Sequence, residues 1–385
     1  MRVLIAAGIY PPDIGGPATY ASLLADFLSL RGHTVTVVCY SDAGGRKVQD
    51  RITVYRVARS RGPFVVYARY AKEMLREAGR HDILYAQGPV AGGLQALFAG
   101  FLFRRKVVVK VTGDYAWERA AGGYAYGGPL EQFQAERTVP LKIRTLRVLE
   151  RFVAVRCSAV IVPSSYLRSI ARGWGVPDER IHTIYNGSDF YHQARERTHK
   201  NRERSPVVLS IGRLVPWKGF ETLLRAWVPV QKRFGYAELR IIGDGPEYKK
   251  LERLVKELDL TRSVYLVGRL GRADILAALQ TASLMVLNSG YEGFSHTILE
   301  AMQAGVPVAA SSIGGNTELV THGETGLLFP FNDCEAITRA IFSVLENPGD
   351  AGVRALHALQ SSSALTIERM CTETEKFLMT IAEKV

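Results

Sequence analysis

Two glutamates in the last third of the chain have a spacing suited to binding a hydroxyl-rich ligand. Glu292 and Glu300 lie in the segment SGYEGFSHTILEA, residues 289–301, which follows an apolar run and passes into a helical pattern. Gly293 lets the backbone between them approach a ligand, and the start of a helix favours nearby negative charge. Carboxylates are poor phosphate ligands but good acceptors for sugar and ribose hydroxyls. The alternatives are a solvated helix position for Glu300 and an ordinary loop acid for Glu292.

Two cations lie in a glycine-flanked loop nearer the middle of the chain. Arg213 and Lys218 belong to the segment GRLVPWKG, residues 212–219, directly after another apolar run. An arginine can grip phosphate oxygens in a bidentate manner and a lysine adds a point charge, so the pair suits a diphosphate. Two surface cations in a loop are the alternative, but the flanking Gly212 and Gly219 favour phosphate binding.

A pair of adjacent glycines follows the first apolar run of the chain. Gly15 and Gly16 lie in the segment YPPDIGGP, residues 10–17, and lead into a helical pattern. Such glycines allow backbone N–H groups to approach an anion closely, and a plain strand–helix turn is the alternative. The sequence contains neither a GxGxxG fingerprint nor a GxxxxGK[ST] P-loop. Simple dinucleotide binding and P-loop NTPase activity are therefore disfavoured.

Alternating strand and helix patterns must position these three loops. β-branched runs alternate with helical spacing in the N-terminal half, and the alternation restarts after residue 205. The predicted strands are residues 3–6, 35–39, 52–57, 83–85, 107–111 and 159–162, then 207–211, 238–242, 264–266, 284–287 and 308–310. This order predicts an α/β fold of two Rossmann-like, doubly wound units with parallel sheets covered on both faces. Because such sheets bind ligands at the carboxyl ends of their strands, we expect the site in a cleft between the units.

A hydrophilic stretch, YHQARERTHKNRERS at residues 191–205, separates the two predicted units. Its near absence of apolar residues is typical of a linker. We therefore expect an N-terminal domain over residues 1–190 and a C-terminal domain over 206–365. A helix at about 366–385 is expected to pack back on the first domain.

The composition describes an ordinary globular chain. The sequence has 385 residues, of which 47% are hydrophobic and 22% charged, and this excludes a disordered or fibrous class. Its four cysteines are far apart, which indicates a reducing compartment and disfavours disulfides or a zinc site. Met1 leads directly into a strand-like run, so we expect no signal peptide. Glycines, glutamines and a proline interrupt the uncharged run 83–103, which is predicted to be a strand and a buried helix, not a membrane span.

The positive charge is concentrated in the N-terminal half. Residues 1–190 contain 26 Lys and Arg against 15 Asp and Glu, a net charge of +11 out of +12 for the whole chain. An apolar stretch runs into three basic residues at 98–106, and basic residues interleave with apolar ones at 141–156. Ordinary core helices with solvated basic faces are one explanation, and contact with an anionic membrane surface is the other. The base-stacking pattern of aromatic and basic residues is absent, so nucleic acid is not expected as a partner.

Taken in order, these motifs resemble the retaining glycosyltransferases of family 4, whose two Rossmann-like domains form the GT-B architecture. The resemblance runs almost end to end. Its carriers are the Gly15-Gly16 loop, YNGSD at 185–189, Gly212-Arg213 with Lys218-Gly219, GDGP at 243–246, the Glu292–Glu300 pair, GVPV at 305–308 and GLL at 326–328. It implies that the N-terminal domain carries the acceptor and the C-terminal domain binds the nucleotide-sugar donor.

The resemblance also implies a role for each site residue. Arg213 and Lys218 would hold the donor diphosphate without a metal or other cofactor, Glu300 would accept from the ribose, and Glu292 would accept from the donor sugar. The remaining donor contacts would come from backbone and flanking groups: Gly15, Gly16, Gly212, Gly293, Phe294 and Ser295 near the diphosphate and sugar, and Val267, Gly268 and Arg269 beside the base.

The chain departs from the family pattern at one position. Many members have a histidine where this chain reads Val111-Thr112-Gly113-Asp114-Tyr115, with Gly113 at the expected place. The family mechanism is front-face substitution in which the departing phosphate takes the acceptor proton, so activity does not require that histidine. Asp114 is the candidate substitute among the catalytic groups, and a helix N-cap is its alternative role.

The sequence thus predicts a retaining, metal-independent hexosyltransferase that uses a UDP- or GDP-sugar. We expect a hydroxyl acceptor, either a lipid-linked or a cell-envelope glycan, and a cytoplasmic protein that is peripheral at the cytoplasmic face of the inner membrane. A catalytically inactive sugar-nucleotide-binding protein and a GT-B sugar-nucleotide epimerase are the alternatives.

Overall fold

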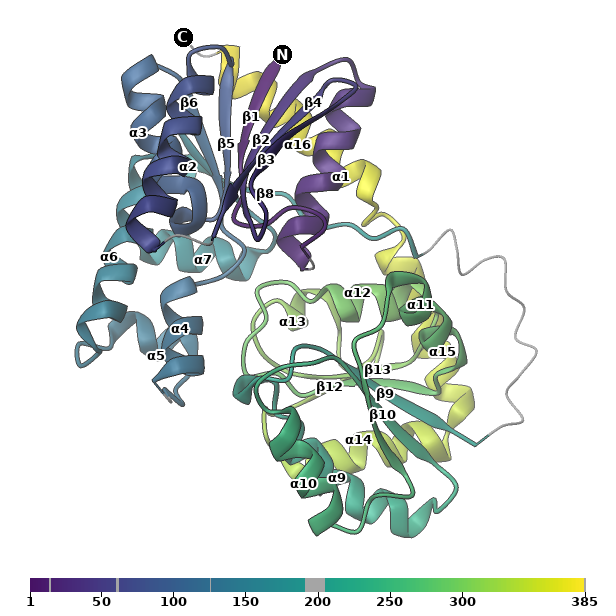
Figure 1. Cartoon of the computed structure of the whole chain (residues 1–385). Coiled ribbons are helices and arrows are strands. Elements are labelled where there is room, and N and C mark those ends of the chain that lie inside the picture. The colour runs from purple at the N-terminus through teal and green to yellow at the C-terminus, as the bar shows by residue number, and fades with distance from the viewer. Residues whose placement is uncertain (14, 60–61, 125, 191–204, 384–385) are drawn as a thin grey trace. The chain divides into compact units, whose positions relative to one another are not determined.

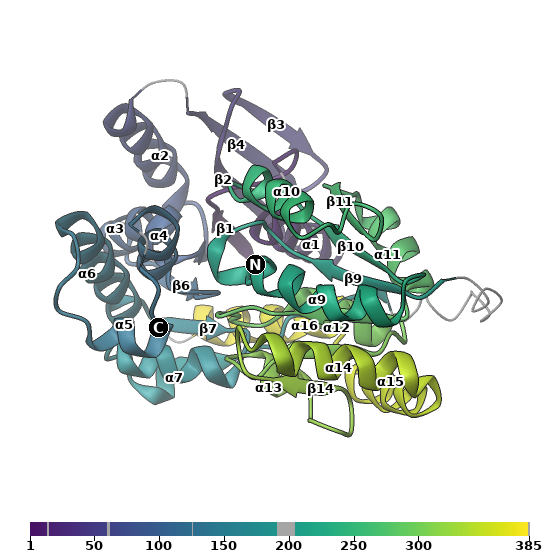
Figure 2. The same cartoon turned by 90° about the horizontal axis from the view of Figure 1, so that it is seen from below.

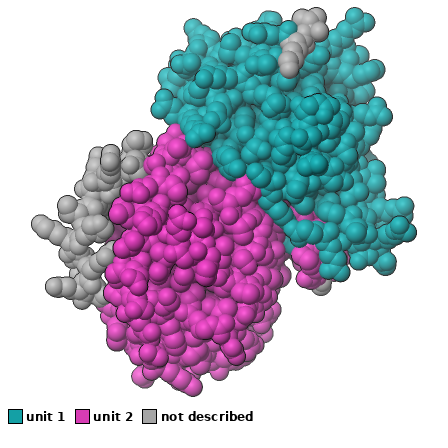
Figure 3. Space-filling view, turned by 180° about the vertical axis from the view of Figure 1, so that it is seen from behind, with its two compact units in different colours: residues 1–119, 131–185, 367–385 teal, residues 120–130, 186–366 magenta. Residues whose placement is uncertain are grey.

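The computed structural model describes residues 1–13, 15–59, 62–124, 126–190 and 205–383. These residues form two units, coloured separately in Figure 3. The first comprises residues 1–119, 131–185 and 367–385, and the second comprises 120–130 and 186–366. Except for Ser205, the expected linker at 191–205 lies outside the described residues.

The first unit is built on an eight-stranded sheet with the order β3-β4-β2-β1-β5-β6-β7-β8. Its strands are β1 (Arg2–Ala6), β2 (Thr34–Ser41), β3 (Gly45–Gln49), β4 (Ile52–Ala58), β5 (Ile83–Gln87), β6 (Lys106–Lys110), β7 (Ala159–Val162) and β8 (Ile181–Thr183). Val3, Leu4 and Ile5 of the central strand β1 are fully buried. Both faces of this strand are therefore covered, as its unbroken apolar run predicts.

The edge strand β3 is an exception to the predicted parallel sheet. It pairs antiparallel with β4, and all of its residues from Gly45 to Gln49 are exposed. Asp50, which has a φ of 51°, lies in the short turn between the two strands. A turn this short can join only antiparallel neighbours. The sequence pattern did not reveal β3, because a fully exposed strand lacks the apolar run.

The direction of each crossover decides which face of the first sheet a helix covers. Crossovers between parallel strands are right-handed, so helices that lead in opposite directions along the sheet lie on opposite faces. Figures 1 and 2 show α1 (Gly16–Leu30) and α16 (Ile367–Glu383) on one face, and α2 (Pro63–Ala78), α3 (Leu94–Phe103) and α6 (Leu141–Arg156) on the other. The remaining elements are η1 (Pro89–Gly93), α4 (Tyr115–Gly123), α5 (Leu130–Ala135), α7 (Ser165–Gly173) and η2 (Asp178–Arg180).

The C-terminal helix α16 belongs to the core of the first unit. Met370, Cys371 and Leu378 pack in one apolar cluster with residues of β1 and α1. At its centre the hydroxyl of Tyr20 lies 3.4 Å from Thr374 Oγ1. Together with α1, α16 thus covers one face of the first sheet.

The uncharged run 83–103 differs in one respect from its prediction. It forms β5, the π-helical turn η1 and α3, but α3 is not buried. The exposed fractions of Phe98, Phe101 and Leu102 are 58%, 84% and 57%. The expectation of a buried helix was wrong because only the face with Ala96, Ala99 and Gly100 packs on the sheet. No helix in the described parts of the chain is long and apolar enough to cross a membrane.

The second unit has a six-stranded sheet in the order β11-β10-β9-β12-β13-β14. Every recorded strand pair in this sheet is parallel. The strands are β9 (Val207–Ile211), β10 (Glu238–Ile242), β11 (Val264–Gly268), β12 (Leu284–Leu287), β13 (Val308–Ser311) and β14 (Leu327–Phe329). The helices are η3 (Pro216–Lys218), α9 (Phe220–Arg233), α10 (Tyr248–Glu257), α11 (Arg272–Thr281), α12 (His296–Gln303), α13 (Asn316–Leu319), α14 (Cys334–Glu346) and α15 (Pro348–Ser362).

The apolar face of α9 forms the centre of the hydrophobic core in the second unit. Leu223, Leu224 and Trp227 are fully buried, and they pack with Ile241 of β10 and Ile341 of α14. Trp227 donates a hydrogen bond of 3.1 Å from Nε1 to Ser263, which satisfies its buried N–H group. The two sheets with their helices confirm the predicted α/β class of two Rossmann-like units.

Candidate functional site

The order in which the chain adds strands to the second sheet reverses between the neighbouring central strands β9 and β12. From β9 the chain adds β10 and β11 on one side, and from β12 it adds β13 and β14 on the other. Open parallel sheets bind ligands at the carboxyl ends of such strands. The loop after β9 contains Arg213 and Lys218, and the loop after β12 contains Glu292. The topology therefore places these predicted site residues at one edge.

A short 3₁₀ turn and a left-handed glycine fix the position of Lys218. Gly219 has a φ of 60°, which glycine adopts without strain. Its carbonyl accepts a hydrogen bond of 2.9 Å from the Asn288 amide, and a β-carbon on Gly219 would collide with Asn288. The Lys218 side chain passes close to Gly212, where an added β-carbon would lie 3.8 Å from Lys218 Cδ. Gly219 is thus required for the placement of the lysine, whereas a β-carbon at Gly212 would make only ordinary contacts.

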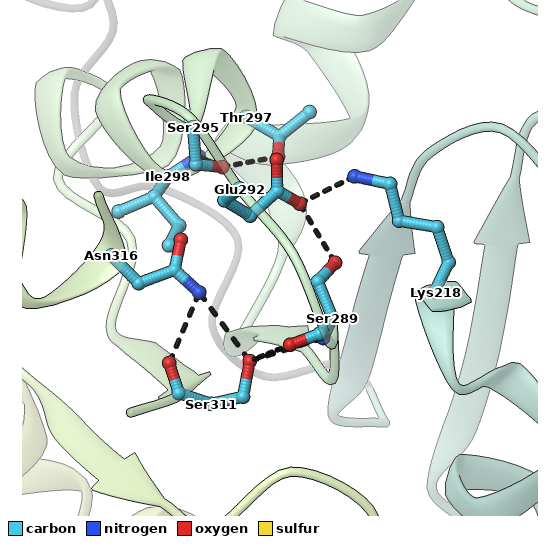
Figure 4. Close-up of polar contacts among 8 residues, drawn as sticks. All are labelled: Lys218, Ser289, Glu292, Ser295, Thr297, Ile298, Ser311 and Asn316. Carbon is cyan, nitrogen blue, oxygen red and sulfur yellow. Dashed lines mark hydrogen bonds and ion pairs between the residues drawn. The ribbon is translucent and has the colours of Figure 1, made fainter. Parts of the chain in front are cut away.

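Lys218 and Glu292 contact each other directly. The Lys218 ammonium forms an ion pair with Glu292 Oε1, and the Ser289 hydroxyl donates to the same oxygen at 2.7 Å (Figure 4). The two charged side chains are 16% and 12% exposed. A cation and a carboxylate that the sequence analysis singled out for ligand binding therefore lie side by side.

A buried polar network holds the loop that carries Glu292. Ser289, Ser311 and Asn316 are all inaccessible to solvent. The Ser311 hydroxyl donates to the Ser289 carbonyl at 2.6 Å, and the Asn316 amide donates to the Ser311 carbonyl at 3.0 Å (Figure 4). Hydrogen bonds of this kind hold a loop in one arrangement, although the buried Asn316 Oδ1 atom has no partner among the described residues. Glu292 is thus positioned before any ligand binds.

The helix α12 begins directly after the Glu292 loop. The Ser295 hydroxyl caps it by accepting from the Ile298 N–H at 3.3 Å, and it lies 3.2 Å from Thr297 Oγ1. Gly293 and Phe294 lie between Glu292 and the cap. A helix N-terminus with its free backbone N–H groups favours an anion. The resemblance placed the phosphate and sugar beside these residues.

Glu300 lies in the second turn of α12 in a largely buried environment. Burial raises the pKa of its carboxyl to about 7, although the nearby Arg272 guanidinium opposes this change. Arg272 itself forms an ion pair with Asp189, and its guanidinium lies 4.8 Å from the centre of the Phe190 ring. A carboxyl with such a raised pKa changes its charge near neutral pH and is typical of functional sites.

The other predicted donor contacts lie in the loops after β9 and β11. Gly268 ends β11 with a φ of 80°, and an added β-carbon there would meet no atom within 4 Å. Arg269 pairs with Asp244 at 3.2 Å. Arg213 is exposed, and no ion pair is recorded for it among the described residues. β10 lies between β9 and β11 in the sheet, and the three strands are parallel. The loops after them therefore share the carboxyl edge with Lys218.

Gly15 and Gly16 occupy the corresponding edge of the first sheet. Gly15 is the N-cap of α1, and Gly16 is the first residue of the helix. A β-carbon on Gly16 would meet no heavy atom within 4 Å. Folding of the free protein therefore does not require a glycine at this position.

Asp114 occupies the helix N-cap that was its alternative role. It is 1% exposed, and its Oδ1 accepts from the Trp117 N–H at 2.7 Å at the start of α4. Its Oδ2 accepts from the Gln134 amide at 2.8 Å. Burial raises the pKa of Asp114. Both carboxylate oxygens are thus engaged in holding local structure.

Several residues of these sites were not found from the sequence. Glu150 of α6 accepts from the N–H groups of Tyr115 and Ala116 at 2.8 and 2.9 Å, although the sequence places it in a basic segment. Ser289, Arg272 and Asp189 were also missed as partners of the two site glutamates. Ser289 and Asp189 lie inside quoted motifs, so their positions gave a usable signal, whereas Arg272 gave none.

Metal-binding residues do not gather anywhere in the described parts of the chain. No three His, Cys, Asp or Glu side chains are close enough there to hold an ion. Cys39, Cys157, Cys334 and Cys371 are free thiols.

Two family descriptions together match most of the chain. Residues 15–187 match the glycosyl transferase 4-like domain, and residues 192–358 match the glycosyl transferases of group 1. The boundary between the two matches falls where the first sheet ends.

Known proteins match the chain over nearly its whole length. The GDP-mannose-dependent α-(1-6)-phosphatidylinositol monomannoside mannosyltransferase of Mycolicibacterium smegmatis is 26% identical over 373 residues, covering 92% of this chain and 93% of that protein. The glycogen synthase of Mycobacterium tuberculosis is 27% identical, covering 94% and 90%. Both relatives transfer sugars according to their names.

Solved structures share the fold. The sucrose-phosphate synthase of Thermosynechococcus elongatus superposes with a TM-score of 0.80 at 21% identity, covering 99% of this chain and 98% of that chain. Anabaena HepE in complex with UDP and glucose gives a TM-score of 0.78 at 22% identity, covering 99% and 100%. These structures are GT-B glycosyltransferases, which confirms the predicted architecture.

Proposed function

The chain belongs to the family-4 type of glycosyltransferases with the GT-B architecture, and from this premise we propose that it transfers a hexose from a UDP- or GDP-sugar with retention. The observation that carries the proposal is the contact between Lys218 and Glu292 at the start of α12. A phosphate-binding cation and a hydroxyl-binding carboxylate meet there. A nucleotide sugar offers a diphosphate directly linked to a hydroxyl-bearing ring, which suits this pairing.

We propose that Arg213 and Lys218 stabilise the diphosphate as it leaves. Negative charge develops on the leaving group as the glycosidic bond breaks, and preorganised cations stabilise that charge in the transition state. The free N–H groups at the start of α12 add to the positive electrostatic potential at this place. No metal is needed in this scheme, because the two side chains supply the charge that a bound cation supplies elsewhere.

For the acceptor step, we propose that the departing phosphate oxygen removes the proton of the attacking hydroxyl on the same face of the sugar. No side chain is needed as a base in this scheme, so the glycine at position 113 is compatible with turnover. Asp114 acts as a positioning residue, because both of its oxygens hold local structure. Its role is to fix the start of α4.

We propose a lipid-linked or cell-envelope glycan as the acceptor, at the cytoplasmic face of a membrane. The name of the mannosyltransferase relative includes phosphatidylinositol monomannoside, a lipid-linked sugar. The net charge of +11 over residues 1–190 of this chain suits an anionic lipid environment. The polar hydroxyl of such an acceptor would react while its lipid part stayed in the leaflet.

A ligand screen tests the donor. Calorimetry or thermal-shift measurements with UDP, GDP, ADP and their sugars should show stabilisation by one nucleotide series. Release of free nucleotide from the matching sugar, even slowly and without acceptor, would distinguish an active transferase from an inactive binding protein. Absence of stabilisation by every nucleotide and sugar would contradict the proposal.

A further inference from the structure

Two helices of the first unit expose rows of large apolar side chains. On α3 the exposed fractions of Phe98, Phe101 and Leu102 are 58%, 84% and 57%. On α6 those of Leu141, Val148 and Phe152 are 77%, 61% and 48%. Each set follows helical spacing, so each forms one outward face. A contiguous patch of this kind on a soluble protein marks an interaction site.

The two rows lie on the same side of the first sheet. Both α3 and α6 follow crossovers that lead in the same direction along the sheet, so both cover the same face. They appear as neighbours in both Figure 1 and Figure 2, and the turn before α3 packs on α6, since a β-carbon on Gly93 would lie 3.0 Å from Val153 Cγ1. We call the outer surface of α3 and α6 the α3–α6 face.

The charges on the α3–α6 face are nearly all positive. Residues 94–106 contain no acid, and residues 141–156 contain only Glu150, which is 1% exposed. Five exposed cations lie on α6 or directly after α3, and no ion pair is recorded for them among the residues that the structure describes: Arg104, Lys106, Lys142, Arg144 and Arg156. Arg156 lies over the ring of Phe152 at 5.7 Å, so charge and apolar surface are interleaved.

Two further arginines of α6 have internal roles. Arg147 donates to the carbonyls of Phe133 and Glu136 at 3.0 and 2.8 Å. Arg151 donates to the side chain of Gln134 at 3.1 Å. Their replacement would disturb α5 and the Asp114 network, so they do not serve as probes of a surface contact.

The combination of charge and apolar surface discriminates among partners. A second copy of the chain, paired through the same face, would bring like charges together and is disfavoured. A nucleic acid would neutralise the cations but would leave Leu102, Leu141 and Val148 without a stacking role. An anionic lipid leaflet satisfies both features, since lipid headgroups pair with the cations and the acyl boundary accepts the apolar side chains.

We propose that the α3–α6 face lies on an anionic lipid leaflet, with Phe98, Phe101 and Leu102 inserted at the boundary between headgroups and acyl chains. This inference deepens the proposed acceptor class, but the binding itself does not depend on turnover. Leu141, at the start of α6, lies toward the carboxyl edge of the first sheet, because α6 runs antiparallel to the strands. Phe101 and Leu102, at the end of α3, lie toward the opposite edge, because α3 runs in the same direction as α6. The α3–α6 face would therefore lie along the leaflet with both edges of the sheet beside it.

Vesicle co-sedimentation of the full chain tests the proposal. The vesicles are phosphatidylcholine alone or an equal mixture of phosphatidylcholine and phosphatidylglycerol. The charge variant is Lys142→Glu/Arg144→Glu/Arg156→Glu, and the apolar variant is Phe98→Ser/Phe101→Ser. The matched control, Lys232→Glu/Lys249→Glu/Lys256→Glu, makes the same charge change at exposed positions of the second unit.

Binding should require the anionic lipid and fall with salt. Because each basic residue near such a surface contributes about 1 kcal/mol, the charge variant should partition at least about 100-fold more weakly. The apolar variant should also lose binding, whereas the control should bind nearly as wild type. Equal recovery in the supernatant with both vesicles, or an equal loss of binding in the control, would overturn the proposal. Thermal shifts with nucleotides on the same preparations report donor binding separately.

Discussion

The Lys218 ammonium pairs with the Glu292 carboxylate across the loops that follow β9 and β12. Each charge neutralises the other in the free protein. If Lys218 binds a diphosphate as proposed, its ammonium is shared between the phosphate and Glu292, which leaves the Glu292 carboxylate a stronger acceptor for a sugar hydroxyl. The pair would then couple diphosphate binding to sugar binding.

Replacement of either cation should affect turnover more than nucleoside binding. Arg213→Ala and Lys218→Ala should each lower kcat by about 10²- to 10³-fold, because one preorganised charge donor contributes about 2.7–4 kcal/mol to the transition state. Steady-state kinetics with the donor identified by the screen measure this effect. Lys232→Ala, at an exposed position of α9, is the control. A kcat near wild type in both site variants would refute the assignment, and EDTA should leave wild-type activity largely intact.

Glu292→Gln should impair recognition of the sugar while it preserves the fold. The amide oxygen can still accept from Ser289 and Lys218, so thermal stability should change little. A hydrogen bond to a charged group contributes about 1.5–3 kcal/mol, so kcat/KM for the nucleotide sugar should fall about 10- to 100-fold. Calorimetry with the free nucleotide should show an unchanged or higher affinity, because Lys218 loses a competing negative charge. Equal losses for nucleotide and nucleotide sugar would place Glu292 outside the sugar site.

The sequence predicts the elements better than the contacts between them. The predicted strands 207–211, 238–242 and 284–287 coincide with β9, β10 and β12, because their apolar residues are buried on both faces. Strands β3 and β14 were not predicted, for different reasons: β3 has no apolar run, and the apolar run of β14 is only three residues long.

In the candidate site, too, the sequence predicts the individual residues better than the contacts between them. Lys218, Glu292 and Glu300 were each singled out by the glycines and helix patterns around them. The Lys218–Glu292 and Arg272–Asp189 pairs join residues 74 and 83 positions apart. The first pair arises because β9 and β12 are neighbours in the sheet. Local sequence does not encode such pairings, since they depend on tertiary topology.

Donor affinity should increase with pH around neutrality. Burial raises the pKa of Glu300 to about 7, so the free protein is partly protonated there. Only the carboxylate can accept from two ribose hydroxyls, so binding should favour ionisation and release a proton below pH 7. Calorimetry with a nucleotide sugar in buffers of different ionisation enthalpy measures that proton. Glu300→Gln should flatten the profile, and proton uptake by the wild type would contradict the expected role.

Gly16→Ala should impair use of the donor without lowering the stability of the protein. Its added β-carbon would meet no heavy atom within 4 Å, and alanine is the better helix former by about 1 kcal/mol. The melting temperature should therefore stay the same or rise slightly. If the Gly16 N–H contacts the diphosphate, a methyl group there should lower kcat/KM by at least about tenfold, or 1.4 kcal/mol. Gly349→Ala, in the first turn of α15 and equally unobstructed, should change neither turnover nor donor affinity.

Variants of Asp114 distinguish a helix cap from an acid–base group. Asparagine caps a helix nearly as well as aspartate, but it cannot donate or accept a catalytic proton. Asp114→Asn should therefore keep turnover near wild type, with some stability lost at the contact with Gln134. Asp114→Ala should destabilise the fold by about 1–2 kcal/mol and raise the KM for acceptor as the start of α4 loosens.

The matched control is Ser164→Ala, which removes the N-cap of α7, where the Ser164 hydroxyl accepts from the Leu167 N–H at 3.1 Å. It should cost similar stability without a change in acceptor KM, because its helix carries none of the predicted site residues. Chemical denaturation and steady-state kinetics on the three variants give both quantities. If Asp114 supplies or removes a proton in the reaction, Asp114→Asn should lower kcat by about 10²- to 10⁴-fold. A loss of that size with an intact fold would show that Asp114 is catalytic, because asparagine retains the capping function and removes only the proton transfer.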